Sequence, residues 1–355
     1  MKILIVIKWT NFGGAEKQAI IDANLLAANG HDVTFLYAIK GGLFSQLSPG
    51  VKIRKVSANL LISSLSVFFL LLQDRFDIVH CHMRWAEKAA IIPAFLSNSK
   101  IINNIHGQVE KQEWYNYTLT RFYSLFVTTV ACNCELARQL KENNHEVPKR
   151  KLVTLYNSFD ENQITRISDL NWQNKIIGFI GRFDEVKRVD HFIEIAKQLI
   201  LSSYTDFKIL IVGSGELYND FLKKIKADKL EEFFEVPGFV KESDPYFKKM
   251  SLFILPSISE GHSVSLTEAQ AYGLPSIVYD VGALKEVIIN GETGFLVPDK
   301  NDIATVKDRI IQLLTSYELW KKLSMNASAN ALARFSGQTR YLNLLKLYRE
   351  MLLKE

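Results

Sequence analysis

The chain has 355 residues, which is long for one domain and suits two, since a domain commonly takes about 100 to 200 residues. Hydrophobic residues make up 48% and charged residues 23%, which excludes a disordered chain, and the longest apolar run, residues 60–72, is shorter than the about 20 residues of a bilayer span. The net charge of +5 at pH 7 is small, and we expect no nucleic-acid partner.

Strands and helices alternate through the N-terminal half. Residues 2–7 are a continuous apolar run, which predicts a strand buried on both faces of a parallel sheet. A loop with paired glycines then opens a helix that ends at Gly30. The further strands are expected at residues 31–38, 51–56, 77–82, 100–105, 128–132 and 151–156, and the helices at 60–73, 84–96, 114–126 and 134–142.

A polar stretch, residues 160–174, is expected to be the linker, after which the pattern restarts. Strands are predicted at residues 175–180, 207–212, 233–236, 251–255, 276–279 and 295–297, and helices at 189–201, 216–226 and 263–273, near Tyr246, and from Asp302, Tyr317 and Gln338. This alternation predicts an α/β protein with doubly wound parallel sheets. We expect domains at residues 1–165 and 166–335, with a final helix, residues 336–355, that crosses back to the first domain.

One stretch, PSISEGHSVSLTEAQAYGLP at residues 256–275, organises the prediction of function. Ser263 is a good N-cap, and Gly273 followed by Pro275 ends the helix. Glu260 lies in the loop before this helix and Glu268 lies within it. The amides of a helix N-terminus bind phosphate, and carboxylates bind sugar hydroxyls. The layout therefore predicts a ligand with a diphosphate between two hydroxylated rings, which is a nucleotide sugar.

Residues directly after parallel strands are further candidates, because ligands bind beyond the carboxyl ends of such strands. Gly13 and Gly14 allow backbone amides to approach a phosphate, or they only make a tight turn. Arg182 and Lys187 are cations that suit a diphosphate. Gly213-Ser214-Gly215 begins a dinucleotide fingerprint, but Tyr218 stands where its third glycine is needed.

Six segments in order resemble glycosyltransferase family 4, whose members have the GT-B fold and retain the anomeric configuration. They are GGAE at 13–16, HG at 106–107, GR-x4-K from 181, GSGE from 213, E-x7-E from 260 and NGETGFLV from 290. The resemblance implies two Rossmann-like domains with parallel sheets facing across a cleft, the C-terminal one for the nucleotide sugar and the N-terminal one for the acceptor. It covers essentially the whole chain.

The resemblance also implies roles for individual residues. Glu260 and His106 would lie at the reacting centre, with Glu260 facing the donor sugar, and Glu268 would bind the ribose hydroxyls. The other donor-binding positions are Gly13, Gly14, Arg182, Lys187, Gly213, Gly215, Phe239, Val240, Gly261, His262, Ser263 and Val264.

Three residues depart from the family pattern. His262 and Ser263 stand where many members have Phe and Gly, beside the sugar or its phosphate, which leaves the donor open. UDP is the first choice from family frequency, ahead of GDP and ADP. Arg188 stands where glycine is common, but the cations Arg182 and Lys187 are retained.

The acceptor side is less informative. DIVHCH at residues 77–82 resembles a segment at the edge of the acceptor cleft, which makes His82 and Trp85 candidates. His80 and His82 share one face of a strand, but no cluster in the sequence completes a zinc site. The DxD triplet that usually binds a divalent metal is missing after the strands. We therefore expect metal-independent binding of the donor and no cofactor.

The positive surplus belongs to the N-terminal half. Residues 1–165 hold 18 Lys and Arg against 13 Asp and Glu, whereas residues 166–355 hold 25 of each. An anionic partner such as a lipid diphosphate is one interpretation, and a random scatter of charge is the other. Three cysteines without framework spacing and an N-terminus without signal-peptide pattern predict a cytoplasmic protein. The basic N-terminal half adds the expectation of peripheral contact with the inner leaflet. The acceptor is expected to be a glycan or a lipid-linked sugar of bacterial surface polysaccharide synthesis.

Two other classes of enzyme and one binding protein remain as alternatives. A non-hydrolysing nucleotide-sugar epimerase shares the fold and the ligand, and would turn over without an acceptor. A Rossmann oxidoreductase needs the glycine fingerprint that Tyr218 interrupts. A sugar-nucleotide sensor would not need Glu260, Glu268 and both cations.

Overall fold

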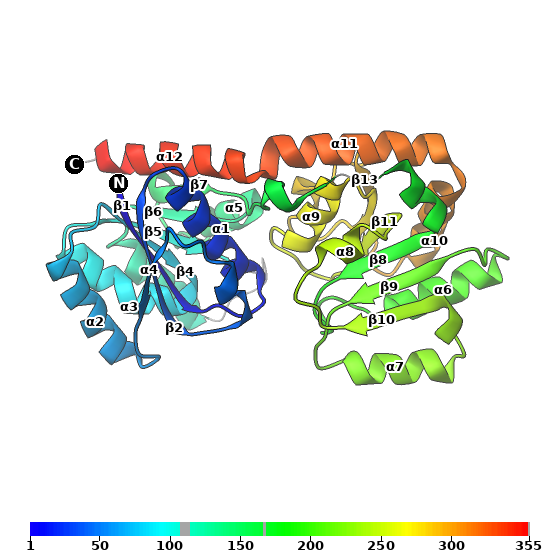
Figure 1. Ribbon diagram of the computed structural model, residues 1–355, viewed down its shortest axis with the longest axis horizontal. Coiled ribbons are helices and arrows are strands. Elements are labelled where there is room, and N and C mark those ends of the chain that lie inside the picture. Colours follow the sequence, from blue (N-terminus) through cyan, green and yellow to red (C-terminus); the bar gives the residue numbers. More distant parts are fainter. Residues whose placement is uncertain (107–113, 166–167, 354–355) are drawn as a thin grey trace. The chain divides into compact units, whose positions relative to one another are not determined.

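The computed structural model describes the chain except for residues 107–113, 166–167 and 354–355 (Figure 1). The chain forms two compact units. Unit 1 comprises Met1–Phe159 and Phe335–Glu355, and unit 2 comprises Asp160–Arg334. The division after Phe159 comes earlier in the chain than the expected boundary after residue 165.

Unit 1 is built on a parallel sheet in the order β3-β2-β1-β4-β5-β6-β7. Its strands are β1 Lys2–Trp9, β2 Asp32–Ile39, β3 Lys52–Lys55, β4 Ile78–His82, β5 Lys100–Ile105, β6 Thr129–Cys132 and β7 Leu152–Thr154. Ile3 pairs with Val33 on one side and with Ile78 on the other. The apolar run of β1 is fully buried, as predicted for a central parallel strand.

Helices cover both faces of this sheet, because right-handed crossovers run in opposite directions from β1. The helices of unit 1 are α1 Gly14–Ala28, α2 Leu60–Gln73, α3 Met83–Leu96, α4 Trp114–Ser124, α5 Glu135–Asn143 and α12 Gly337–Leu353. Helix α12, drawn in red in Figure 1, packs on α1. Helix α3 packs on β1, β4 and β5, and α2 packs on α3.

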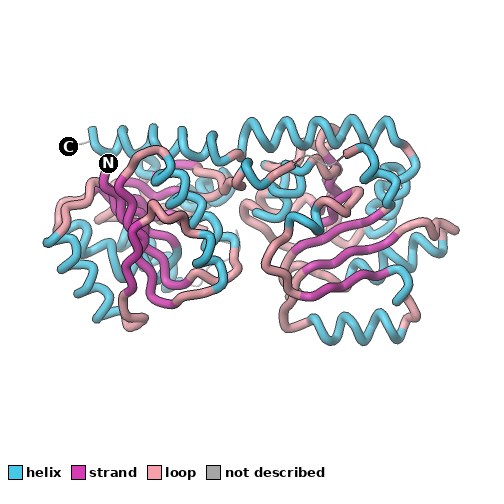
Figure 2. The backbone as a smooth tube through the Cα atoms, in the orientation of Figure 1, coloured by secondary structure: helices cyan, strands magenta, loops and turns pink. Residues whose placement is uncertain are grey.

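Unit 2 repeats the architecture with a parallel sheet in the order β10-β9-β8-β11-β12-β13 (Figure 2). Its strands are β8 Ile176–Ile180, β9 Lys208–Val212, β10 Phe234–Gly238, β11 Leu252–Leu255, β12 Ser276–Tyr279 and β13 Gly294–Val297. Its helices are α6 His191–Leu201, α7 Tyr218–Ala227, α8 Asp244–Phe247, α9 Val264–Tyr272, α10 Ile303–Thr315 and α11 Tyr317–Phe335. Short 3-10 helices are η1 Gly42–Gln46, η2 Lys149–Lys151, η3 Glu161–Gln163, η4 Asp169–Asn174, η5 Glu231–Phe233 and η6 Leu284–Glu286.

The end signals predicted for α9 are confirmed. The Ser263 hydroxyl accepts a hydrogen bond from the Leu266 amide at 3.5 Å, so Ser263 is the N-cap. Gly273 has φ of 84°, the left-handed conformation that glycine adopts most readily, and it ends the helix. Helix α9 therefore starts directly after the loop that carries Glu260.

The polar stretch expected to be a linker is in part packed onto unit 2. Asn171 is buried, and its amide donates to the carbonyls of Lys248 and Met250. The Trp172 indole donates to the Leu313 carbonyl at 2.9 Å. The stretch was predicted to be a linker, but at Asn171 the polar group satisfies buried carbonyls of unit 2.

The three cysteines, Cys81, Cys132 and Cys134, are buried and form no disulfide. Burial raises the pKa of the Cys132 thiol to about 12, which makes it unreactive at neutral pH. None of the helices in the described residues combines the length and the apolar character needed to cross a membrane.

Candidate active site

The candidate donor residues of unit 2 gather at one edge of its sheet. Strand order reverses between β8 and β11, since the chain moves from β8 outward to β10 and then returns to β11 on the other side. Ligands of open parallel sheets bind at such a switch point, beyond the carboxyl ends of the strands. The loops after β8, β9, β10 and β11 hold the donor positions predicted in this half of the chain, except for Val264 and Glu268, which lie in α9.

The loops after β8 and β9 interlock through glycines. Gly213 has φ of 140°, and a Cβ there would lie 1.8 Å from the Gly181 carbonyl oxygen. A Cβ on Gly215 would lie 2.4 Å from the Phe183 carbonyl oxygen, and the Phe183 amide donates to the Ser214 carbonyl at 3.1 Å. These glycines are therefore required for loop packing, whatever they contribute to a ligand.

Lys187 and Glu260 form an ion pair at the switch point. The Lys187 ammonium contacts Glu260 Oε1, and the Ser257 hydroxyl donates to the same oxygen at 2.8 Å. Their side chains are 15% and 12% exposed. Sequence analysis assigned Lys187 to the diphosphate and Glu260 to the sugar, and here the two residues are partners of each other. A ligand that uses both must exchange with this pair.

The backbone of Glu260 is held from the other side by the loop after β12. The Ala283 amide donates to the Glu260 carbonyl at 3.0 Å. Gly282 has φ of 56°, and a Cβ there would lie 2.0 Å from that carbonyl oxygen. Gly282 was missed by sequence analysis, because its role appears only when the loops after β11 and β12 are placed together.

Arg182 differs from Lys187 in its exposure. Its side chain is 72% exposed, and its guanidinium lies 3.4 Å from an Asp184 carboxylate oxygen. Asp184 also accepts the Lys187 backbone amide at 2.9 Å, which orders the loop that carries both cations. Arg182 thus offers an accessible guanidinium, the group that binds phosphate in a bidentate way.

The backbone conformation at Arg188 accounts for the glycine that is common at this position in the family. It has φ of 49°, the left-handed conformation in which glycine is common and other residues are rare. Its guanidinium donates to the Lys300 carbonyl at 2.9 Å and to Asn301 Oδ1 at 3.1 Å. These contacts hold Arg188 away from the Lys187–Glu260 pair.

The remaining donor positions surround the start of α9 and the end of β10. Glu268 and His262 are buried, with 8% and 4% of their surfaces exposed. Gly261 and Val264 are half-buried. Phe239, which follows β10, is 52% exposed, and Val240 beside it is half-buried. Phe239 therefore places a large, partly exposed aromatic ring directly beyond the strand.

The candidate residues of unit 1 also lie after its strands. Gly13 is the N-cap of α1 and has an extended backbone, and Gly14 opens the helix. His82 ends β4 and His106 follows β5, which neighbours it in the sheet. Gly107, the second residue of the HG segment, lies outside the described residues.

His106 is held by two hydrogen bonds to one nitrogen. Its Nε2 lies 2.9 Å from Asn104 Nδ2 and 3.0 Å from His82 Nδ1. Because the Asn104 amide donates, Nε2 accepts and the imidazole proton resides on Nδ1. That Nδ1 has no hydrogen-bond partner in the described part of the chain. Burial lowers the pKa of His106 to about 4, so the ring is neutral at pH 7 and Nδ1 is a hydrogen-bond donor.

His82 is fully buried and therefore acts on a ligand only through His106. Its ring stacks on that of His80 at 4.2 Å, as expected for alternate residues of one strand. The Tyr348 hydroxyl of α12 lies 2.8 Å from His80 Nδ1. Trp85, the other acceptor candidate, donates its indole N–H to the Ala58 carbonyl at 3.2 Å.

A buried ion pair that sequence analysis missed lies behind these histidines. Arg340 of α12 donates to both carboxylate oxygens of Asp22 in α1, at 2.9 and 2.7 Å, and all but about 1% of both side chains is buried. Gln18 adds a hydrogen bond to Asp22 at 2.8 Å. The available signal was an aspartate inside the apolar segment AIIDANLL, since a buried carboxylate needs a partner.

Asp22, His80 and His82 are close enough to hold a metal ion, with ligand atoms within 4.8 Å of one another. The fold thus supplies the carboxylate that the sequence did not reveal beside the two histidines. However, Asp22 is engaged by the Arg340 guanidinium, whose positive charge would oppose a dication, and His80 is engaged by Tyr348. The contacts favour a closed hydrogen-bond network here.

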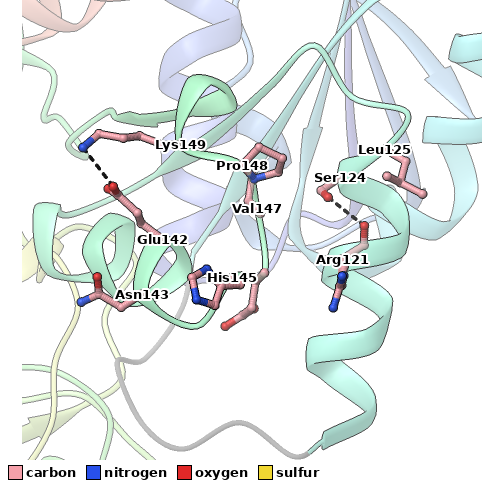
Figure 3. A pocket seen from close by; sticks show the side chains of 10 residues that line it. Arg121, Ser124, Leu125, Glu142, Asn143, His145, Val147, Pro148 and Lys149 are labelled. Carbon is pink, nitrogen blue, oxygen red and sulfur yellow. Dashed lines mark hydrogen bonds and ion pairs between the residues drawn. The ribbon is translucent and has the colours of Figure 1, made fainter.

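A groove of about 670 Å³ lies elsewhere in unit 1 (Figure 3). Its walls come from the ends of α4 and α5, and Lys149 pairs with Glu142 at 3.0 Å on the α5 side. Helices of this fold end where the following strands begin, so the groove is remote from the carboxyl ends of the strands. The candidate active site lies at those carboxyl ends.

Two family models together match nearly the whole chain. The model for glycosyltransferase family 4 matches residues 12–163, and the model for glycosyl transferases group 1 matches residues 160–330. The fold and the matched segments define a glycosyltransferase of the GT-B class. The chain belongs to glycosyltransferase family 4.

The individual relatives of known name share about a quarter or less of their residues with this chain. The chain is 24% identical to the N-acetyl-alpha-D-glucosaminyl L-malate synthase of Bacillus anthracis, with 88% of this chain and 87% of the relative covered. It is 24% identical to the UDP-Gal:alpha-D-GlcNAc-diphosphoundecaprenol alpha-1,3-galactosyltransferase of Escherichia coli, with 96% and 95% covered. The structure of Anabaena HepE in complex with UDP-glucose has a TM-score of 0.83 at 18% identity, with 99% of this chain and 100% of HepE covered, which shows the shared fold.

Proposed function

We propose that this glycosyltransferase transfers a sugar from a UDP-sugar to an acceptor hydroxyl with retention of the anomeric configuration. The observation that carries the proposal is the Lys187–Glu260 ion pair at the switch point of unit 2, beside the exposed guanidinium of Arg182. The HepE complex with UDP-glucose and the Escherichia coli relative that uses UDP-Gal support the choice of UDP.

In this mechanism the donor replaces the internal contacts of the site. The diphosphate takes Lys187 as its partner, together with Arg182 and the amides at the start of α9. Glu260, released from Lys187, accepts hydrogen bonds from the sugar hydroxyls and orients the ring. Glu268 binds the ribose hydroxyls. Because these cations and amides balance the phosphate charge, we propose that the donor binds without a divalent metal.

Transfer then occurs on one face of the sugar. The bond from the anomeric carbon to the phosphate oxygen breaks, and the acceptor oxygen forms its bond on the same face. The departing phosphate oxygen accepts the proton of the acceptor hydroxyl, so UDP leaves with that proton. His106, through its Nδ1–H, donates a hydrogen bond to a ligand oxygen at the reacting centre, and His82 holds the ring in place.

We propose a glycan or lipid-linked sugar as the acceptor, in bacterial surface polysaccharide synthesis at the cytoplasmic side of the membrane. The diphosphoundecaprenol acceptor of the Escherichia coli relative supports a lipid carrier. The name of the Bacillus anthracis relative, an N-acetyl-alpha-D-glucosaminyl L-malate synthase, supports a small soluble acceptor instead. Assays with matched lipid-linked and soluble acceptors decide between them, and use of a soluble sugar alone would reject the lipid carrier.

The donor assignment is tested by thermal unfolding with UDP, GDP, ADP and NAD. We expect UDP to stabilise the wild type by about 2.7 kcal/mol at a hundred times its dissociation constant. Glu268→Ala should remove this stabilisation, because the ribose loses its carboxylate, whereas Glu231→Ala at an exposed position should keep it. Stabilisation by NAD alone would contradict the proposal. Turnover of the UDP-sugar without any acceptor would indicate an epimerase.

A further inference from the structure

Helix α2 presents an apolar stripe to solvent. Leu61, Leu65, Phe69 and Leu72 are 79%, 59%, 58% and 59% exposed, and their spacing places them along one side of the helix. Ile62 beside them is 55% exposed. Isolated exposed apolar residues are ordinary, but a continuous stripe of this kind marks a surface that another body covers.

The helix is mostly apolar, although only a narrow side of it is buried. The fourteen residues LLISSLSVFFLLLQ contain no charged side chain. Only Ser63, Val67 and Leu71 are buried, on the side that packs against α3. Figure 1 shows α2, in blue, at the margin of unit 1. An uncharged helix with large apolar side chains on its solvent side exposes an unusual apolar surface, and unit 1 does not cover it.

Basic residues border both ends of α2 in the sequence. Strand β3 before the helix has four exposed residues, among them Lys52, Arg54 and Lys55, and exposed Arg75 follows the helix. Lys52 is paired with Asp32 at 2.7 Å. Arg54, Lys55 and Arg75 have no ion-pair partner within the described ranges. Three cations thus remain available to an anionic partner.

Charge also separates the two units. Unit 1 contains 22 Lys and Arg against 13 Asp and Glu, and unit 2 contains 21 against 25. The positive surplus is therefore confined to the unit that carries α2. The boundary of the units makes this separation sharper than the division at residue 165, because Asp160 and Glu161 belong to unit 2 and the cations of α12 belong to unit 1.

We propose that the apolar stripe of α2, with the exposed basic residues that flank the helix in the sequence, docks on an anionic lipid bilayer, with the helix lying in the interface. An interfacial helix inserts its apolar side among the acyl chains while neighbouring Lys and Arg bind acidic headgroups. A second copy of this chain is a poorer occupant, because a symmetric contact would bring the two sets of flanking cations together. The inference deepens the proposed lipid-linked acceptor, but vesicle binding needs neither donor nor acceptor.

The test is cosedimentation of the full chain with vesicles, in the absence of substrates. We expect binding to phosphatidylglycerol–phosphatidylethanolamine vesicles at low salt and much weaker binding to phosphatidylcholine vesicles. The double variant Leu65→Gln/Phe69→Gln should lower the partition coefficient at least about tenfold, since two large apolar side chains no longer insert. Leu201→Gln, at a position 78% exposed on α6 of unit 2, is the matched control and should bind as the wild type does.

A second pair of substitutions tests the charge. Arg54→Glu/Lys55→Glu should weaken binding to anionic vesicles and reduce its dependence on salt. Wild-type binding that both double variants leave unchanged would overturn the proposal, as would absence of binding to anionic vesicles. A dimer in analytical ultracentrifugation that Leu65→Gln/Phe69→Gln dissociates, without vesicle binding, would assign the stripe to a second copy. Retained stabilisation by UDP in the variants separates these outcomes from failure of the donor site.

Discussion

The candidate sites of the two units are built in opposite ways. In unit 1, His82 and His106 are backed by the buried Asp22–Arg340 pair, which joins α1 to α12. In unit 2, the Lys187–Glu260 pair lies on loops after β8 and β11 and keeps partial access to solvent. The comparison shows that two similar sheets can carry ion pairs with different roles, one in stability and one in the candidate donor site. The network in unit 1 is enclosed, whereas the proposed mechanism has the donor take the place of the internal contact of the pair in unit 2.

The largest effect is expected from breaking the buried pair of unit 1. Arg340→Met leaves the Asp22 carboxylate buried without its cation, which should lower the free energy of unfolding by about 3 to 5 kcal/mol. Urea unfolding measures this change, and Arg349→Ala, at an exposed position of α12, is the control. A loss below about 1 kcal/mol would mean that Arg340 does not hold unit 1 together.

Substitution of the exchangeable pair should act on activity instead. Glu260→Gln is expected to lower kcat about a hundredfold or more, because the donor sugar loses its charged partner. The free energy of unfolding should fall by less than in Arg340→Met, because a glutamine side chain still accepts the hydrogen bond from the Ser257 hydroxyl and Lys187 keeps partial access to solvent. Steady-state kinetics with denaturation of the same variant checks both. If stability falls as far as in Arg340→Met, the contrast between the units is wrong.

Acid should lower the free energy of unfolding through the buried histidines of unit 1, and this loss should grow gradually as the pH falls. Burial lowers the pKa of His80 and His82 well below 6.5 and that of His106 to about 4. Below pH 6.5 the unfolded histidines take up protons while the folded ones stay neutral, so stability falls as pH falls toward 4. The loss cannot exceed about 1.4 kcal/mol per histidine for each pH unit, which is the slope for one proton taken up by the unfolded chain.

Urea unfolding at pH 7 and pH 5.5 measures this slope. Asp22 opposes the loss, because its carboxylate favours the charged form of His82, whereas Arg340 adds to it. Replacement of the exposed His145 by Gln is the matched control and should leave the slope unchanged. His80→Phe/His82→Phe should reduce the slope and leave only the share of His106, so an undiminished slope would place the titrating groups elsewhere.

Local signals in the sequence were sufficient for much of the fold and for part of the site. The cap at Ser263, the end at Gly273 and the buried run of β1 follow from short-range rules, and the structure confirms them. Arg188 looked like a simple departure, yet its φ of 49° shows that it adopts the conformation glycine would take.

Contacts between distant residues could not be predicted. Asp22 and Arg340 are 318 positions apart, and neither has a motif that names the other. Lys187 and Glu260 were assigned to different parts of a ligand because each loop was read alone, and only the order of β8 and β11 brings them together. Hydrogen bonds that depend on sheet order therefore lie beyond the reach of local patterns.

The buried Asp22–Arg340 ion pair has a consequence for folding during synthesis of the chain. The ribosome releases residues 1–159 first, but the buried Asp22 lacks its cation until α12 has also emerged. Unit 2 can fold earlier, because all of its residues precede α12. We therefore expect residues 1–159 to remain incompletely folded until α12 has been synthesised. During this period of translation the segment should depend most on chaperones.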